Sequence, residues 1–124
     1  LATCTKLRKL GLSNNSITSI EGILNLQYLE ALDIQRNMLD EMENMVVNWP
    51  LMRYLNLCEC GLFGFPILNT PKLSKLLLKG NNIGLKELCR LKKIKSLRYL
   101  ALDEVNVATR RAVGTDLIIC SKYQ

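Results

Sequence analysis

The chain has 124 residues, of which 48% are hydrophobic and 23% are charged, so it can form one folded domain with a continuous core. It contains no histidine, which excludes catalytic and metal sites that need an imidazole. The net charge of +6 is unevenly divided, because residues 1–61 carry 5 basic and 7 acidic side chains, whereas residues 62–124 carry 12 and 4.

One pattern, LxxLxLxxN, recurs along the chain. Its copies open at Leu7, Leu29, Met52, Leu73 and Leu97, with separations of 22, 23, 21 and 24 residues. In each LxL segment the two leucines lie on the same side of an extended strand, and neighbouring copies can bury them jointly. We therefore expect five short parallel strands, near residues 9–12, 31–34, 54–57, 75–78 and 99–102.

The residue that closes each pattern is expected to sit at a turn. An asparagine there satisfies backbone groups that the bend leaves unpaired, which predicts a structural ladder of Asn15, Asn37, Cys60 and Asn81. We interpret Cys60 as a structural member of this ladder and not as a reactive thiol. Beyond the turns, apolar residues continue at intervals of three, as at Ile17, Ile20 and Ile23, and predict a buried outer wall.

Both ends of the chain depart from the pattern. Leu1 and Cys4 have the spacing of outer-wall residues, so we expect the repeats to start mid-repeat and to span residues 1–107. At the other end Val105 replaces the turn asparagine. Residues 108–124 are predicted to form a C-terminal capping segment, with Thr109 as the N-cap of a helix that carries Val113, Leu117 and Cys120 at helical spacing.

The segment Leu7–Leu29, LRKLGLSNNSITSIEGILNLQYL, resembles the 22-residue subclass of leucine-rich repeats. This subclass occurs in a type-1 protein phosphatase regulator, an axonemal dynein light chain and a spliceosomal ribonucleoprotein subunit. The resemblance implies an α/β solenoid with a parallel β-sheet on its concave face and short helices, 3-10 turns or loops on its convex face. It also implies an intracellular subunit that binds a partner through the concave sheet.

The outward-facing strand positions form our candidate partner-binding surface. Tyr54, Leu77 and Tyr99 are of the types that dominate binding energy at interfaces, although the alternative that they are scattered surface residues stays open. The full set is Lys9, Asp33, Gln35, Tyr54, Asn56, Lys75, Leu77, Lys79, Tyr99 and Asp103.

A basic stretch provides a second candidate surface. It comprises Lys86, Arg90, Lys92, Lys93, Lys95 and Arg98. It is either a solvated outer face or a surface for RNA phosphates or for an acidic protein such as tubulin. No aromatic side chains for stacking bases are interleaved in it, which disfavours RNA.

Catalytic and cofactor motifs are missing from the sequence. There is no glycine-rich phosphate loop, and Cys58 and Cys60 have no second pair at zinc spacing, so we expect no enzyme activity, no metal, no cofactor and no small-molecule substrate. No apolar run approaches the roughly 20 residues of a membrane span. Five cysteines, an odd number, favour reduced thiols in the cytosol, with an extracellular receptor as the alternative.

These patterns predict a protein-binding scaffold or a regulatory or structural subunit. The expected setting is a cytoskeletal, axonemal or phosphatase-regulating assembly in the cytoplasm, including the cytoskeleton and cilium. The alternative is a ribonucleoprotein component that uses the basic residues 86–98, which would place the chain in the nucleus.

Overall fold

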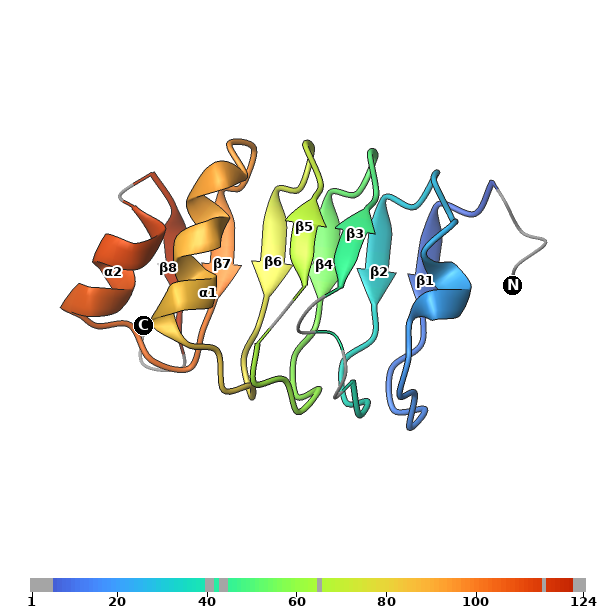
Figure 1. Ribbon diagram of the computed structural model, residues 1–124, viewed down its shortest axis with the longest axis horizontal. Coiled ribbons are helices and arrows are strands. Elements are labelled where there is room, and N and C mark those ends of the chain that lie inside the picture. The colour runs from blue at the N-terminus through green and yellow to red at the C-terminus, as the bar shows by residue number, and fades with distance from the viewer. Residues whose placement is uncertain (1–5, 40–41, 43–44, 65, 115, 122–124) are drawn as a thin grey trace.

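A six-stranded parallel sheet dominates the computed structural model of the protein (Figure 1), which describes residues 6–39, 42, 45–64, 66–114 and 116–121. The strands follow one another in chain order as β1 (Lys9–Gly11), β2 (Ala31–Asp33), β4 (Tyr54–Asn56), β6 (Lys75–Leu77), β7 (Tyr99–Ala101) and β8 (Ile118–Cys120). The register is unbroken, and it aligns Lys9, Ala31, Tyr54, Lys75, Tyr99 and Ile118 in one row. The predicted parallel sheet is confirmed, and the fold is an α/β repeat fold.

The leucines of the repeated pattern form the core behind this sheet. Leu32, Leu55 and Leu76, at the centres of three adjacent strands, are almost completely buried. Burying one leucine side chain stabilises the fold by about 1.5–3 kcal/mol, but a single repeat has nothing to bury it against. The strands are therefore stable only as a stack.

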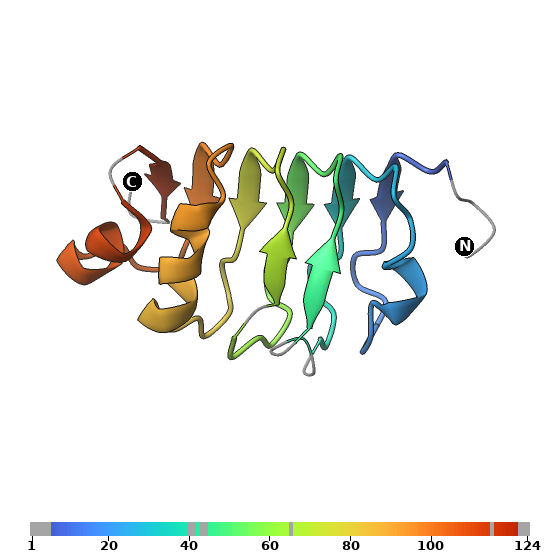
Figure 2. The same cartoon turned by 45° about the horizontal axis from the view of Figure 1, so that its top comes forward.

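A second, two-stranded sheet lies across the core from the first (Figure 2), where the sequence predicts short helices, 3-10 turns or loops. It consists of β3 (Val46–Asn48) and β5 (Ile67–Asn69), paired in parallel. Valine and isoleucine favour extended backbone, and the two segments lie in neighbouring repeats, so each gives the other a partner. The prediction for the outer wall is therefore wrong in these two repeats.

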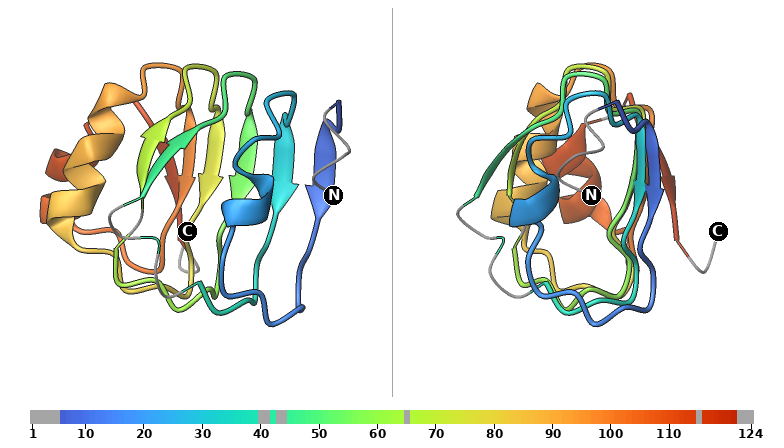
Figure 3. Two further views of the ribbon diagram at one scale, coloured as in Figure 1. Left: turned by 45° about the vertical axis from the view of Figure 1, so that its right-hand side comes forward. Right: turned by 90° about the vertical axis from the view of Figure 1, so that its right-hand side faces the viewer.

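Helical segments cover the outer side of the other repeats, as the sequence predicts. They are η1 (Glu21–Ile23), α1 (Leu85–Arg90), η2 (Leu91–Lys93) and α2 (Val107–Val113). Viewed along the row of strands, successive repeats superpose, with the large sheet on one side and the second sheet and helices on the other (Figure 3). None of the helices within the described ranges is long and apolar enough to cross a bilayer.

The C-terminal segment differs from the prediction. The N-cap of α2 is Asn106 and not Thr109, because the Asn106 Oδ1 accepts hydrogen bonds from the Thr109 backbone N–H at 2.9 Å and from its hydroxyl at 3.1 Å. The helix ends at Val113, and its C-cap Gly114 has a φ of 90°. The chain then returns to the sheet as β8, because pairing with β7 favours an extended Ile118–Cys120 over the helix that the apolar spacing predicts. Leu1, Cys4 and residues 122–124 lie outside the described residues.

Candidate protein-binding surface

The outward side of the six-stranded sheet, which we call the sheet surface, carries the predicted partner-binding residues in rows. Because side chains alternate along a strand, the residues on either side of each buried leucine point away from the core. The first row contains Lys9, Ala31, Tyr54, Lys75 and Tyr99, and the second contains Gly11, Asp33, Asn56, Leu77 and Ala101. Strand β8 extends the rows by Ile118 and Cys120, both exposed, which the sequence analysis missed.

Exposure within these rows is uneven. Tyr99 is 44% exposed and its neighbour Ile118 is 55% exposed, so together they form an apolar end of the surface. Tyr54 and Leu77, which we expected to be exposed, are half-buried. Asn56 is only 5% exposed, and its Oδ1 accepts a hydrogen bond from the Cys58 N–H at 3.0 Å. This hydrogen bond braces the turn that follows β4, and the assignment of the buried Asn56 to the partner-binding set stays a prediction.

Polar contacts fix the orientation of Tyr54. The Asn56 side-chain amide donates to the Tyr54 hydroxyl at 3.4 Å, and the Lys75 ammonium lies 5.9 Å from the centre of the Tyr54 ring. Burial raises the pKa of the Tyr54 phenol, and the Asp33 carboxylate raises it further. Tyr54 is thus a neutral, oriented phenol, able to donate or accept a hydrogen bond at the centre of the sheet surface.

A third row, which includes the predicted Gln35, Lys79 and Asp103, lies where the strands turn away from the sheet. It contains Ser13, Gln35, Cys58, Lys79 and Asp103. Asp33 receives hydrogen bonds from the backbone N–H of Gln35 at 3.2 Å and from its side-chain amide at 3.3 Å. The Asp103 carboxylate accepts a bond of 2.8 Å from the Gly80 N–H. These contacts hold polar side chains in fixed positions, which reduces the entropy that binding a partner would cost.

Charged side chains flank the strands at both ends. Glu30 lies between Arg8 and Arg53, with N–O distances of 3.6 and 3.9 Å. At the opposite end, Arg36 contacts Glu59 at 2.8 Å, although each side chain is more than half exposed. Exposed pairs of this kind contribute only about 0–1 kcal/mol to folding, so exchanging them for contacts with a partner costs little.

The ladder residues bridge adjacent repeats. The Asn37 Oδ1 accepts the N–H groups of Asn15 and Ile17 at 3.0 and 2.8 Å, and its amide donates to the carbonyls of Leu12 and Ile34 at 2.9 and 2.8 Å. Two repeats later, Asn81 makes the equivalent contacts: its Oδ1 accepts the N–H groups of Cys60 and Leu62, and its amide donates to the carbonyls of Leu57 and Leu78. Asn15, at the first turn, is exposed and its amide donates to the Ser13 carbonyl.

Cys60 replaces this asparagine in the third repeat with fewer contacts. Its thiol donates to the Ile34 carbonyl at 3.1 Å, and the Leu39 N–H bonds to the Cys60 backbone carbonyl at 3.0 Å instead of to a side-chain oxygen. Burial raises the pKa of the Cys60 thiol, as it does for the half-buried Cys58. Both thiols are therefore poor nucleophiles at neutral pH.

The residue before each ladder position has a left-handed backbone. Asn14, Arg36, Glu59 and Gly80 occupy the same place in four successive repeats, with φ between 53° and 77°. Gly80 also lies close to its neighbour in the preceding turn, because a Cβ there would lie 2.6 Å from the Glu59 Cγ. The first four turns thus share one geometry, which keeps the strand ends, and with them the third row, at a constant spacing.

Five residues of the basic stretch line two grooves, and Lys95 lines both of them. Arg90, Lys93 and Lys95 line a groove beside β5, whereas Lys92 and Arg98 line a different groove beside the segment after α2, together with Lys95. Lys86 lines neither. The Arg98 guanidinium donates to the carbonyls of Lys95 and Leu97, so part of its hydrogen-bonding capacity is used within the chain.

Among the side chains that the structure describes, no three histidine, cysteine or acidic residues are arranged to hold a metal ion. Cys58, Cys60, Cys89 and Cys120 are all free thiols. The predicted Cys4 thiol lies outside the described residues.

Comparison with known sequences supports a repeat protein. Residues 5–45 match the family described as leucine-rich repeats, in two copies. No curated protein sequence matches the chain. The matched residues include β1 and β2, and the pattern they share with the rest of the chain runs on through the parallel sheet. Residues 5–45 are thus similar to leucine-rich repeats, whose domains generally mediate protein–protein interaction, and the parallel sheet fits such a repeat fold.

Proposed function

We propose that this chain is a scaffold or regulatory subunit that binds a partner protein through the sheet surface. The observation that carries the proposal is the row that joins Tyr54, Lys75, Tyr99 and Ile118 on adjacent strands. Aromatic and apolar groups held on a rigid sheet bind with a small loss of conformational entropy. The charged pairs that flank the row supply electrostatic register with the partner.

The finer parts of the proposal rest on the resemblance of Leu7–Leu29 to the 22-residue subclass. We propose that the repeats continue as a solenoid with the sheet surface on its concave side. By the same resemblance, the partner belongs to a cytoskeletal, axonemal or phosphatase-regulating assembly, and the protein acts in the cytoplasm. The free thiols of the described cysteines favour a reducing compartment over the extracellular alternative.

Affinity capture with matched variants tests the binding surface. The double variant Tyr54→Ala, Tyr99→Ala removes the aromatic groups of the first row, and Tyr28→Ala is the control, because Tyr28 is 47% exposed but lies outside the large sheet. The proposal is supported if a partner that binds the purified chain is lost with the double variant and retained with Tyr28→Ala. Equal capture by all folded variants, as judged by their circular dichroism and thermal unfolding, contradicts it.

The alternative, a ribonucleoprotein component, is favoured by the excess of basic residues in the second half of the chain. It predicts RNA affinity that falls steeply with salt and with Lys92→Glu, Lys93→Glu. Absent or salt-insensitive binding of a single-stranded RNA contradicts this alternative. The compartment has its own test: labelling the unfolded chain without reductant should modify all five cysteines. Disulfide-capped repeats of an extracellular receptor would give fewer labels.

A further inference from the structure

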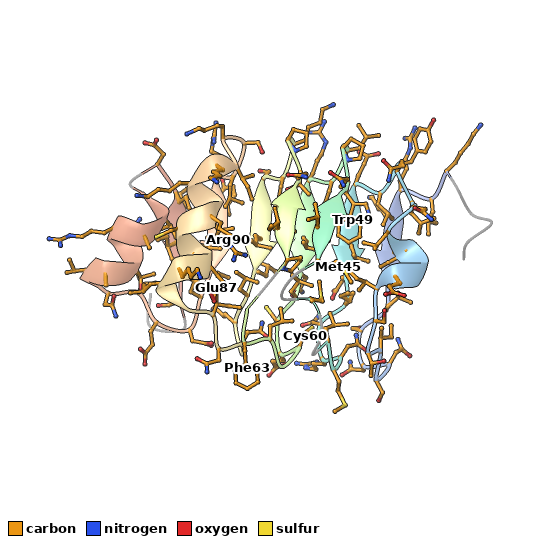
Figure 4. The ribbon with its side chains drawn as sticks, in the orientation of Figure 1. Met45, Trp49, Cys60, Phe63, Glu87 and Arg90 are labelled. Carbon is orange, nitrogen blue, oxygen red and sulfur yellow. The ribbon has the colours of Figure 1, made fainter. Side chains whose placement is uncertain are left out.

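A groove opens where the outer wall of the molecule changes from strand to helix. Strand β5 pairs with β3 along one edge, but on its other side the next repeat presents α1 and η2 (Figure 2). The groove between them has a volume of about 570 Å³ and is lined by residues 66–71 and by Arg90, Leu91, Lys93, Ile94 and Lys95. Figure 4 shows Arg90 on the side of α1 toward the β-strands.

The backbone at the floor of this groove has the polarity of an unpaired strand edge. The Ile67 N–H donates to the Met45 carbonyl in β3 at 2.8 Å. In a parallel ladder, alternate residues direct both of their backbone groups to the same neighbour. The N–H and C=O of Leu68 therefore point away from β3, toward the groove. They offer a donor and an acceptor to an added strand.

The side chains around the groove select the charge of an occupant. Lys93 and Lys95 are both exposed, and neither makes an ion pair with any residue that the structure describes. No carboxylate is among the residues that line the groove. Ile67, which is 44% exposed, and Ile94 provide apolar contacts beside this charge.

We propose that this groove binds an extended acidic segment of a partner protein, which adds to β5 as a third strand. Its backbone pairs with Leu68, and its carboxylates lie beside Lys93 and Lys95. Because β5 has only three residues, the backbone bonds are few, and the interaction depends on charge and weakens with salt. This site is on the opposite side of the core from the sheet surface, so it does not rest on the function proposed above.

A peptide of alternating glutamate and valine residues is a suitable probe, because it is acidic and favours an extended backbone. Titration of the ¹⁵N-labelled chain followed by NMR should shift the Leu68 amide and slow its hydrogen exchange. The Ile67 amide, already bonded to Met45, should keep its exchange rate. The double variant Lys93→Glu, Lys95→Glu should weaken binding about tenfold or more, since it places like charges together. The matched control, Lys86→Glu and Lys92→Glu, makes the same change in net charge outside the groove and should retain affinity within about threefold.

Four results would overturn the proposal. The first is no perturbation of Leu68 at millimolar peptide. The second is equal weakening by the two double variants, which would mean that the peptide senses only the net charge of the chain. The third is undiminished binding of a peptide N-methylated at every residue, which has no backbone N–H to donate from either edge and cannot pair as a strand. A single-stranded RNA that displaces the peptide and binds more tightly would likewise assign the groove to phosphate and not to a peptide. Tyr99→Ala, on the sheet surface, should leave every one of these measurements unchanged.

Discussion

Replacing Asn37 by alanine should destabilise the fold more than replacing Asn15, the other ladder residue of the first two repeats, by alanine. Asn37 is 5% exposed and its side chain joins two N–H groups and two carbonyls of adjacent repeats at 2.8–3.0 Å. Leaving a buried polar group unsatisfied costs about 1–3 kcal/mol, and water can reach some of these four groups, so we expect a loss of about 3–5 kcal/mol. Such a loss is a large fraction of the roughly 5–15 kcal/mol that stabilises a typical domain.

Urea unfolding followed by circular dichroism measures this loss, and two variants calibrate it. Asn15→Ala makes the same chemical change at an exposed position, where the side chain bonds only to the Ser13 carbonyl, and should cost less than about 1 kcal/mol. Asn37→Cys copies the residue that the third repeat carries at this place and should fall between the two. If Asn37→Ala and Asn15→Ala destabilise the chain equally, the ladder does not stabilise the fold in the way that its hydrogen bonds indicate.

Three further predictions follow from other features. Gly80→Ala should lower the free energy of unfolding by about 1–2 kcal/mol, because φ is 77° and the new Cβ meets Glu59. The control Gly22→Ala has open space around its Cβ and should not lower it, so equal thermal unfolding of the two variants would contradict the strain expected at Gly80. Ellman's reagent should modify the exposed Cys89 and Cys120 before Cys58, and Cys60 only on unfolding; early reaction of Cys60 would contradict its burial. The free energy of unfolding should fall as the pH rises above 9.0, the ordinary pKa of a thiol. Above this pH the Cys60 thiol loses its proton in the unfolded chain but keeps it in the folded chain, where its pKa is raised. In urea titrations at several pH values, Cys60→Ala should make this decline less steep.

The inner strands could be predicted from sequence because their determinants are local and repeated. Two leucines in an LxL segment give both the strand and the direction of its side chains, so the rows of the sheet surface followed from the spacing alone. Strand β8 has no such pattern. Its residues Ile118 and Ile119 become a strand because the β7 edge is available, and that is a property of the stack.

The outer wall and the exposure of single side chains were beyond the sequence for a related reason. Val46–Asn48 and Ile67–Asn69 are strands because neighbouring repeats both present extended segments, and a pattern within one repeat does not contain this information. In the same way, Asn56 occupies an outward position by period but is buried by the residues around it. The periodicity predicts direction, whereas burial depends on what the adjacent repeats supply.

Different joints between repeats are held by different side chains. Asn37 and Asn81 tie the first joint and the third through side-chain amides, but the second joint has Cys60 and the fourth has Val105, which offers no hydrogen bond. At the second joint β3 pairs with β5 and Asn69 donates to Asn48 at 2.9 Å, and at the fourth α1 packs against α2.

At the second and fourth joints, which lack a ladder asparagine, contacts on the outer side connect the same two repeats. We therefore expect the chain to unfold as one unit when a force pulls its two ends apart.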